Sequence, residues 1–577
     1  MATSPAGPAS PAGPPFPAGP PFPAGPAPLA DPVRLELFTN RLSAIAREMG
    51  EMLERTALST NVKERLDFSC ALLDPRGELV VNAPHIPVHL GALGLCVRRV
   101  AEALPLGPGD VAVTNHPGYG GSHLPDVTVI TPVFGAAEGH GVPLLGYAAS
   151  RAHHAEIGGS RPGSMPPGAR SLAEEGVVLE PQHLVHGGAP RWEAVRRRLA
   201  GGRWPSRAVE ENLADLAAAV AANRRGADAL ARLAAAEGRE TVEAAMAAIE
   251  ARAEARLRRA LALRLSERGP GRGEVVERLD DGSPIRVAVT LHAEGAGPAG
   301  ARTALTVDFT GSAPVHPGNL NATPAVVRSA VLYVLRLLVG EPLPLNEGLL
   351  RPVELVLPEG MLAPPFPDDA ERCPAVVGGN TETSQRVVDA LLAALGLAAG
   401  SQGTMNNVLF GDERFGYYET VAGGCGAGPG FAGASAVHSH MTNTRATDPE
   451  VLERRYPVRL ERFAVRRGSG GTGRWPGGDG VVRELVFTAP VSLSVLTQRR
   501  TEGPRGMAGG GRGAPGRQRV VRVSGDEVEL GPVDGCEIEA GDRLVLATPG
   551  GGGWGVPTDP RPAGPGDRRG RFASPRT

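Results

Sequence analysis

The feature that most restricts the fold of this chain is the change in its hydrophobic periodicity along the sequence. Apolar residues recur at helical spacing over 31–56 and again over the alanine-rich stretch 206–266. Between them, from 61 to 187, short apolar runs such as CALLD, DVAVT and DVTVITPVF alternate with glycine, proline, histidine and aspartate. Strand pairs are then predicted at 285–291 and 303–309 because apolar residues alternate there. Helices at 324–339 and 381–398 follow, and the order of segments predicts an α+β protein.

Composition shifts divide the chain further. Residues 1–30 are a Pro/Ala/Gly near-repeat that cannot bury enough apolar surface to fold, so we expect a disordered, polyproline-like leader. The sequence RGPGRG at 268–273 separates helix from strands and predicts a domain boundary near 268–280. We therefore expect a strand-rich N-terminal domain with a helical segment over 31–268 and a mixed C-terminal domain over 269–556. The Pro/Gly/Arg-rich residues 557–577 are expected to form a disordered tail.

Charge and cysteine content exclude several classes of protein. The formal net charge of −2 gives no reason to expect a nucleic acid or an anionic membrane as partner, and no apolar run is long enough to span a bilayer. The five cysteines form no CxxC pair, and the first 30 residues lack the features of a signal peptide, so a reduced, cytoplasmic protein is expected. Lys63 is the only lysine, which rules out a GxxxxGK[ST] nucleotide-binding loop.

Three segments combine imidazoles and carboxylates next to predicted strands. HLPD stands before one strand, the next predicted strand ends in twin histidines, and two acidic residues precede a third strand. Such side chains can meet at one divalent cation, and the absence of cysteine favours Mn²⁺, Fe²⁺ or Zn²⁺ with open coordination positions. The alternative is that these residues only cap turns. The candidates are His123, Asp126, His153, His154, Glu64 and Asp67.

Other histidines are candidates for binding a small substrate. His85 and His89 are four residues apart, but two prolines in the same stretch argue against a regular helix, so we expect them at most to line a pocket. His438 and His440 alternate in a predicted strand or loop, and Asn443 follows with a side chain that can hydrogen-bond an imide. The alternative for this segment is a solvated loop with one buried histidine.

The sequence also resembles the hydantoinase B/5-oxoprolinase family. The resemblance runs in order from about 31 to 556, and it is carried by APHIPVHLGAL, GSHLPDVTVITPV, SRAHHAEIGGSRPGSMPP, GGNTETSQRVVDALL, HSHMTNTRATDPE and TPGGGGWG. The family includes B subunits of N-methylhydantoinase, the C-terminal half of 5-oxoprolinase and subunits of acetone and acetophenone carboxylases. The carboxylase members hold manganese through a histidine and an aspartate of the HLPD-like motif and a histidine of the following strand. The resemblance implies that the matching ligands in this chain are His123, Asp126 and one of His153 or His154, with an acidic ligand near Glu64 or Asp67.

The resemblance implies a function as well. An A-type subunit uses ATP-Mg to activate the carbonyl of a small cyclic amide, and the present chain, as the B-type subunit of a hetero-oligomer, hydrolyses the activated ring. Glu64 or Asp67 is the candidate base, and His116 stands where an aspartate is more common in the family. Two alternatives remain: a subunit of an ATP-dependent ketone carboxylase, and a non-catalytic scaffold for the A-type subunit.

Overall fold

The structure is a computed structural model that describes residues 31–557, apart from 84–85, 137–140, 269–270 and 294–302. The leader predicted over 1–30, the tail from 558 onward and the candidate residue His85 lie outside the described residues. Helices and strands alternate in groups along the chain, which confirms the α+β prediction. Within the described residues, no helix is both long and apolar enough to cross a membrane.

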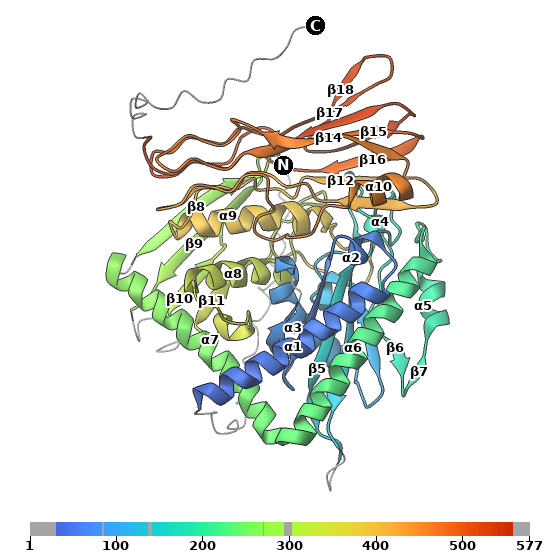
Figure 1. Ribbon diagram of the computed structural model, residues 1–577, viewed down its shortest axis with the longest axis vertical. Helices are drawn as coiled ribbons and strands as arrows, with labels where there is room; N and C mark the ends of the chain where they lie inside the picture. Colours follow the sequence, from blue (N-terminus) through green and yellow to red (C-terminus); the bar gives the residue numbers. More distant parts are fainter. Residues whose placement is uncertain (1–30, 84–85, 137–140, 269–270, 294–302, 558–577) are drawn as a thin grey trace, which may run out of the picture.

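The N-terminal part is built on a seven-stranded antiparallel sheet in the order β2-β1-β5-β4-β3-β6-β7. Its strands are β1 (Phe68–Leu73), β2 (Leu79–Asn82), β3 (Val111–Thr114), β4 (Asp126–Phe134), β5 (Leu144–His153), β6 (Gln182–His186) and β7 (Ala189–Pro190). Helices α1 (Pro32–Thr56) and α6 (Val209–Glu237) lie side by side on one face, and α3 (Pro87–Ala103) packs on the other (Figure 1). Because both faces are covered, the central strands are buried along their whole length.

Strand alternation assigns each side chain of this sheet to one of two cores. Leu72 and Ala148 point to the core under α1 and α6, whereas Leu73 and Ala149 point to the core under α3. By the same alternation, odd-numbered residues of β5 from Tyr147 onward face α3, and this places His153, at the end of the strand, on the α3 side.

Helix α3 corrects one expectation from the sequence. The prolines near His89 were expected to prevent a regular helix, but Pro87 is the first residue of a helix that continues to Ala103. Proline is tolerated at this position because the amide of the first helical residue has no partner within the helix. His89 therefore lies in the first turn of α3, facing the end of the sheet.

The alanine-rich stretch is helical, as predicted, and it forms two helices, because Gly238 ends α6 before α7 (Arg239–Arg268) begins. A second sheet follows in the order β11-β10-β9-β8, with α9 (Ser384–Ala394) packed on it and α8 (Pro324–Val339) packed between α9 and α3. Its strands are β8 (Arg272–Arg278), β9 (Pro284–Leu291), β10 (Leu305–Asp308) and β11 (Val353–Val356). The antiparallel pairing of β9 with β10 confirms the predicted strand pair.

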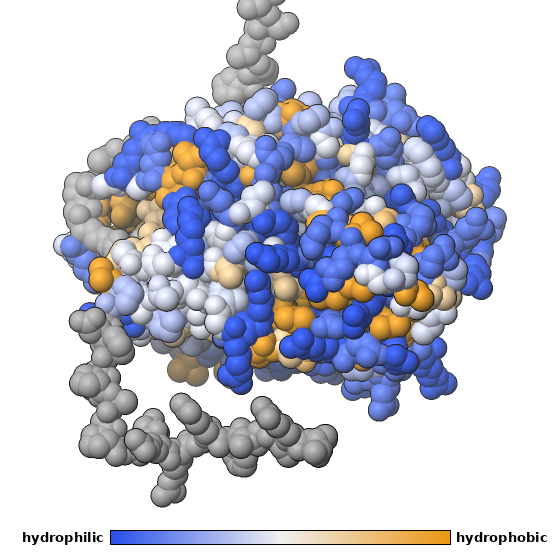
Figure 2. Space-filling view, turned by 90° about the horizontal axis from the view of Figure 1, so that it is seen from above, coloured by the Kyte–Doolittle hydropathy of each residue, from blue (hydrophilic) through white to orange (hydrophobic). Residues whose placement is uncertain are grey.

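The last part is a sandwich of two sheets, ordered β13-β12-β16-β19 and β14-β15-β20-β17-β18, that share one apolar core (Figure 1). Seen from above, the molecule is largely hydrophilic with small apolar patches (Figure 2). The strands are β12 (Asn407–Gly411), β13 (Gly416–Glu419), β14 (Val458–Arg466), β15 (Gly480–Phe487), β16 (Val491–Leu496), β17 (Arg517–Val521), β18 (Glu527–Glu529), β19 (Val533–Ile538) and β20 (Arg543–Ala547).

The shorter helical elements connect these layers. They are α2 (Thr60–Lys63), η1 (Pro117–Tyr119), α4 (Leu172–Glu175), α5 (Trp192–Leu199), η3 (Glu347–Leu350), the π-helical turn η4 (Gly379–Thr383) and α10 (Pro449–Arg455). The turn η4 runs directly into α9, so the predicted helix over 381–398 begins as a π-helix and ends at Ala394.

Candidate functional site

The candidate site lies on the α3 side of the first sheet, at the edge where β1 and β4 begin and β5 ends. Asp126 and His153 are direct cross-strand partners, and the backbone amide of His153 donates to the carbonyl of Asp67, just before β1. His123 reaches the same point from the turn that leads into β4. Antiparallel pairing thus brings residues from distant parts of the sequence to one end of the sheet.

Donor atoms of His123, Asp126 and His153 all lie within 4.8 Å of one another. His123 Nδ1 is 3.0 Å from Asp126 Oδ2, and His153 Nδ1 is 3.4 Å from Asp126 Oδ1. These three residues are at most 2% exposed. In the part of the chain that the structure describes, His123 Nδ1, Asp126 Oδ1 and His153 Nε2 are buried without a hydrogen bond of good geometry. Unpartnered buried donors and acceptors are costly, so the donor set fits a divalent cation.

The remaining contacts of Asp126 hold its carboxylate in place. Ser122 Oγ donates to Asp126 Oδ2 at 2.5 Å, and His89 Nε2 lies 3.3 Å from the same oxygen. Burial opposes ionisation of Asp126, but the nearby imidazoles of His123 and His89 outweigh it and hold the pKa of the carboxyl well below its usual range. Burial also lowers the pKa of His153, which favours the neutral imidazole that binds metals.

The twin histidines separate onto opposite faces. His153 faces the cluster, whereas His154 turns toward α6, where its Nδ1 lies 3.1 Å from Asn212 Nδ2. His154 is therefore placed away from the other predicted ligands. Among the acidic candidates, Asp67 Oδ2 lies 4.0 Å from His153 Nδ1, at the edge of the cluster. Glu64 is a half-buried residue at the end of α2.

His116 lies apart from these side chains, at the end of β3. Its Nδ1 accepts a hydrogen bond from the amide of Gly118, and its Nε2 lies 3.5 Å from Glu180 Oε1. Burial lowers the pKa of His116 to about 4, so the ring is neutral near pH 7. These contacts favour a role in shaping the glycine-rich loop over one in proton transfer at the cluster.

Two later segments cover the cluster, and the sequence alone did not single out their side chains. From η4, Asn380 Nδ2 lies 3.5 Å from His123 Nε2. From β13, the ring of Tyr418 stacks on His153 with a centroid distance of 4.5 Å and an interplanar angle of 16°. A π-helical turn is a rare element that is frequent at functional sites. The family-like segment GGNTETSQ was the one signal that pointed to Asn380.

Tyr418 connects the cluster to a buried carboxyl. Its hydroxyl donates to Asn407 Oδ1 at 3.0 Å, and Asn407 Nδ2 donates to Glu382 Oε1 at 2.7 Å. Burial raises the pKa of Glu382 to about 8, so this carboxyl holds its proton near pH 7. A protonated acid close to the cluster is a candidate proton donor.

The predicted substrate contacts of the C-terminal segment lie in two places. His438 and Asn443 line a cavity of about 400 Å³. Burial lowers the pKa of His438 to about 4. Arg65 joins this cavity to the cluster, because its guanidinium lies 4.9 Å from the centroid of the Tyr418 ring and donates to Thr420 Oγ1 on the cavity wall. His440 is instead paired with Asp389 Oδ1 at 2.9 Å.

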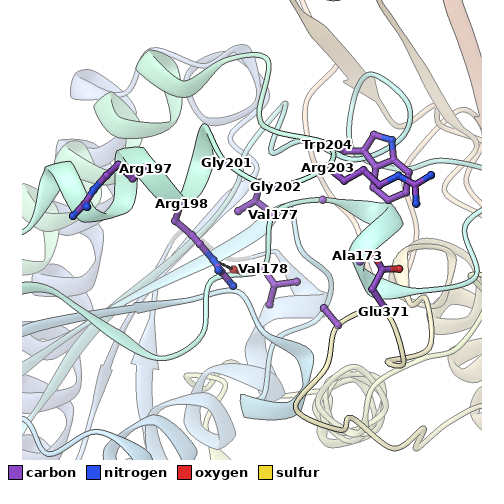
Figure 3. A pocket seen from close by; sticks show the side chains of 12 residues that line it. Ala173, Val177, Val178, Arg197, Arg198, Gly201, Gly202, Arg203, Trp204 and Glu371 are labelled. Carbon is purple, nitrogen blue, oxygen red and sulfur yellow. Dashed lines mark hydrogen bonds between the residues drawn. The ribbon is translucent and has the colours of Figure 1, made fainter.

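A cavity of about 270 Å³ near the end of α5 is drawn in Figure 3. Arg203 and Trp204 lie together on one side of its lining with Glu371 near them, and Arg198 lies across from them. The Arg203 guanidinium lies over the ring of Trp204 at 4.3 Å from the centroid. The lining of this cavity does not include any of the predicted site residues.

Fold and site together define an α+β protein with a buried His–Asp–His cluster at the end of a fully covered sheet. The chain belongs to the Hydantoinase B/oxoprolinase family, whose model matches residues 31–557. It is 46% identical over 550 residues to 5-oxoprolinase 1 of Arabidopsis thaliana, a match that covers 91% of this chain and 42% of that protein. With 5-oxoprolinase of Saccharomyces cerevisiae it shares 44% identity over 552 residues, covering 91% and 42% of the two chains. The chain thus spans less than half the length of these relatives.

Two solved structures are similar in fold. The ATP-dependent caprolactamase from Pseudomonas jessenii matches with a TM-score of 0.79 and 26% identity, covering 92% of each chain. A nucleotide-free acetone carboxylase matches with a TM-score of 0.77 and 19% identity, covering 92% of this chain and 77% of the other. The second likeness is one of fold alone.

Proposed function

We propose that this chain is the part of an ATP-dependent cyclic amidase that hydrolyses a lactam or imide ring after a separate ATP-using polypeptide has activated the ring carbonyl. The substrate class is that of 5-oxoproline and hydantoins. The observation that carries the proposal is the buried convergence of His123, Asp126 and His153. Relatives named 5-oxoprolinase and a fold neighbour named ATP-dependent caprolactamase support it, because both names describe chemistry on cyclic amides.

The activation step explains why ATP is needed. Amide resonance makes the ring carbonyl a poor electrophile, and phosphorylation of its oxygen creates a good leaving group. Water then adds to the carbon, and the C–N bond of the ring breaks as its nitrogen takes up a proton, which leaves an acyl phosphate. A second water hydrolyses the acyl phosphate to the carboxylate and inorganic phosphate. A divalent cation at His123, Asp126 and His153, with Mn²⁺, Zn²⁺ and Fe²⁺ as candidates, supplies Lewis acidity toward a carbonyl oxygen when bound.

The protein's own groups would divide the remaining work. Asp67, at the edge of the cluster, is the candidate base for the attacking water. Glu382, which holds its proton near pH 7, is the candidate acid for the leaving ring nitrogen. Tyr418 fixes the plane of His153 by stacking. His438 and Asn443, in the cavity beyond Arg65, are the proposed contacts for the part of the substrate away from the scissile bond.

Access from solvent must involve movement. Because the residues of the cluster are at most 2% exposed, a ring from bulk water reaches them only after a covering segment shifts. The covering segments are η4 and β13, which approach the cluster through Asn380 and Tyr418. Binding of the activated substrate, or docking of the ATP-using A-type subunit in a hetero-oligomer, would supply the free energy for such a shift.

The test combines the chain with an A-type polypeptide and follows ring opening of 5-oxoproline together with bound metal. His123→Ala should lose both turnover and metal, while nucleotide binding by the partner persists. His154→Gln is the matched control, because His154 is equally buried at the same strand end but faces α6, and it should retain the metal. Unchanged turnover and metal content in His123→Ala would exclude the proposal. Dependence of turnover on bicarbonate would instead indicate a carboxylase.

A further inference from the structure

A second group of metal-binding side chains lies at the far end of β3, away from the candidate site. Asp110, His183 and His186 place one donor atom each within 4.8 Å of one another. His186 Nδ1 is 3.1 Å from Asp110 Oδ1, and His183 Nε2 is 3.6 Å from Asp110 Oδ2. The two imidazole rings are 4.4 Å apart between centroids.

A β-bulge brings these two histidines together. Residues three apart on a regular strand point to opposite faces of the sheet. The register of β6 against β3 shifts between Val111 and Ala112, because Val111 pairs with Val185 whereas Ala112 pairs with His183. The extra residue on β6 reverses the alternation, so His183 and His186 reach the same carboxylate. A bulge that redirects a side chain in this way is a common feature of functional sites.

Asp110 is fixed independently of the histidines. The amide of Gly187 donates to its Oδ1 at 2.7 Å, and the amide of Gly107 donates to its Oδ2 at 2.8 Å. A carboxylate that is already held in place by two backbone amides loses little freedom when it binds a cation.

His183 has the open donor atom that a ligand needs. Its Nε2 is buried and makes no hydrogen bond within the described parts of the chain. A hydrogen bond between His186 and Asp110 would explain why those two side chains are close. It does not explain why His183 Nε2 lies next to the same carboxylate without a hydrogen bond of its own.

We propose that Asp110, His183 and His186 form a second, zinc-type metal site on the edge of the first sheet. Two imidazoles and one carboxylate are ligands that Zn²⁺ accepts in a tetrahedral arrangement with one position left for water or an incoming group. The His186 side chain is 53% exposed, so this open position faces solvent. A bound ion would link β6, which carries both histidines, to Asp110 at the start of β3.

The second site is separate from the first. Asp110 precedes β3, whereas the strand end next to Asp126 lies beyond Thr114. Strands rise about 3.3 Å per residue, so Asp110 and the strand end beside Asp126 are roughly 20 Å apart. Loss of one site therefore does not remove a ligand of the other, and the two can be measured independently.

The experiment measures zinc stoichiometry and affinity of the full chain by competition with a chromogenic zinc chelator. The double variant His183→Gln/His186→Gln should lose one equivalent of Zn²⁺ relative to wild type, and His183→Gln alone should weaken that equivalent at least about 100-fold, since loss of even an outer-shell partner costs 10–100-fold. His316→Gln is the matched control, because His316 pairs with Asp281 at 2.7 Å as a lone imidazole–carboxylate pair. It should leave the stoichiometry unchanged.

Two results would overturn the assignment. One is an unchanged number of zinc equivalents in the double variant. The other is an equal loss in the His316→Gln control, which would show that any surface imidazole beside a carboxylate binds zinc under the assay conditions. His123→Ala removes a different equivalent, so failure of the proposed catalytic site and failure of this site give different patterns. Thermal unfolding with Zn²⁺ and with EDTA provides a second readout, and the zinc-dependent stabilisation should shrink in the double variant.

Discussion

The turn η4 offers a sharp test of how the candidate site is positioned, through the substitution Gly379→Ala. A Cβ atom added at Gly379 would lie 1.8 Å from the carbonyl oxygen of Asn321 and 2.6 Å from the amide nitrogen of Ala322. Non-bonded carbon and oxygen atoms approach to about 3.3 Å at the closest, so η4 must move by roughly 1.5 Å. Both obstacles are backbone atoms, which cannot rotate away as a side chain can.

The displacement also changes the position of Asn380 relative to His123, because Asn380 directly follows Gly379 in η4. Misplacement of a catalytic group by about 1 Å can cost about 100-fold in rate, so we expect a turnover loss of that order for Gly379→Ala. Overpacking of this kind costs about 1–3 kcal/mol in stability, and the rigid obstacles favour the upper end of that range. Denaturant unfolding measures the second effect, and ring opening with the ATP-using partner measures the first.

Gly168→Ala is the control for this prediction. An added Cβ at Gly168 meets no atom within 4 Å, so this variant should match wild type in both assays. Gly379→Ala should also lower the affinity for the bound metal by about 10–100-fold, as loss of an outer-shell partner does. Wild-type metal affinity and turnover in Gly379→Ala would refute the idea that η4 positions the cluster.

Two further predictions follow from buried titratable groups. Burial raises the pKa of Glu382 to about 8. Protonation of this carboxyl therefore stabilises the folded state fully below the usual glutamate pKa, and this stabilisation is lost as pH rises through about 8. Glu382→Gln should therefore gain stability relative to wild type between pH 5 and 9 in thermal unfolding, and should lose about 100-fold or more in ring opening; a constant difference across this range would contradict the buried acid. His440→Ala removes the imidazole partner of Asp389, so the free energy of unfolding should fall by about 1–3 kcal/mol. The KM for the cyclic amide should stay within about twofold, and a large rise in KM would instead support a role of His440 in substrate binding.

Much of the fold was predictable because its signals are local. Alternation in β9 and β10, the helical periodicity of α1 and the short apolar runs of the first sheet each act within a few residues. The helix α3 was missed because proline was treated as a helix breaker at Pro87, where it is the first helical residue. Chain order alone could not give the strand order, since β5 lies between β1 and β4.

The cluster was predictable in part for a related reason. Asp126 and His153 belong to neighbouring strands, and their residue types already indicated a metal site. Alternation within β5 then separates His153 from His154, but this requires knowing where the strand ends. Asn380 and Tyr418 could not be found from spacing, because they come from segments more than 200 residues away and carry side chains that are common in loops and strands.

The strand β20 has a consequence for how the molecule is made. It is the last strand among the described residues, yet it occupies the middle of its sheet, between β15 and β17. During synthesis the edges of both neighbours must wait unpaired until residue 547 emerges, and exposed edges of this kind invite wrong partners. Nascent chains of this protein should therefore depend on chaperones late in translation, and a stop codon only a dozen residues before the end of β20 should cost the whole sheet.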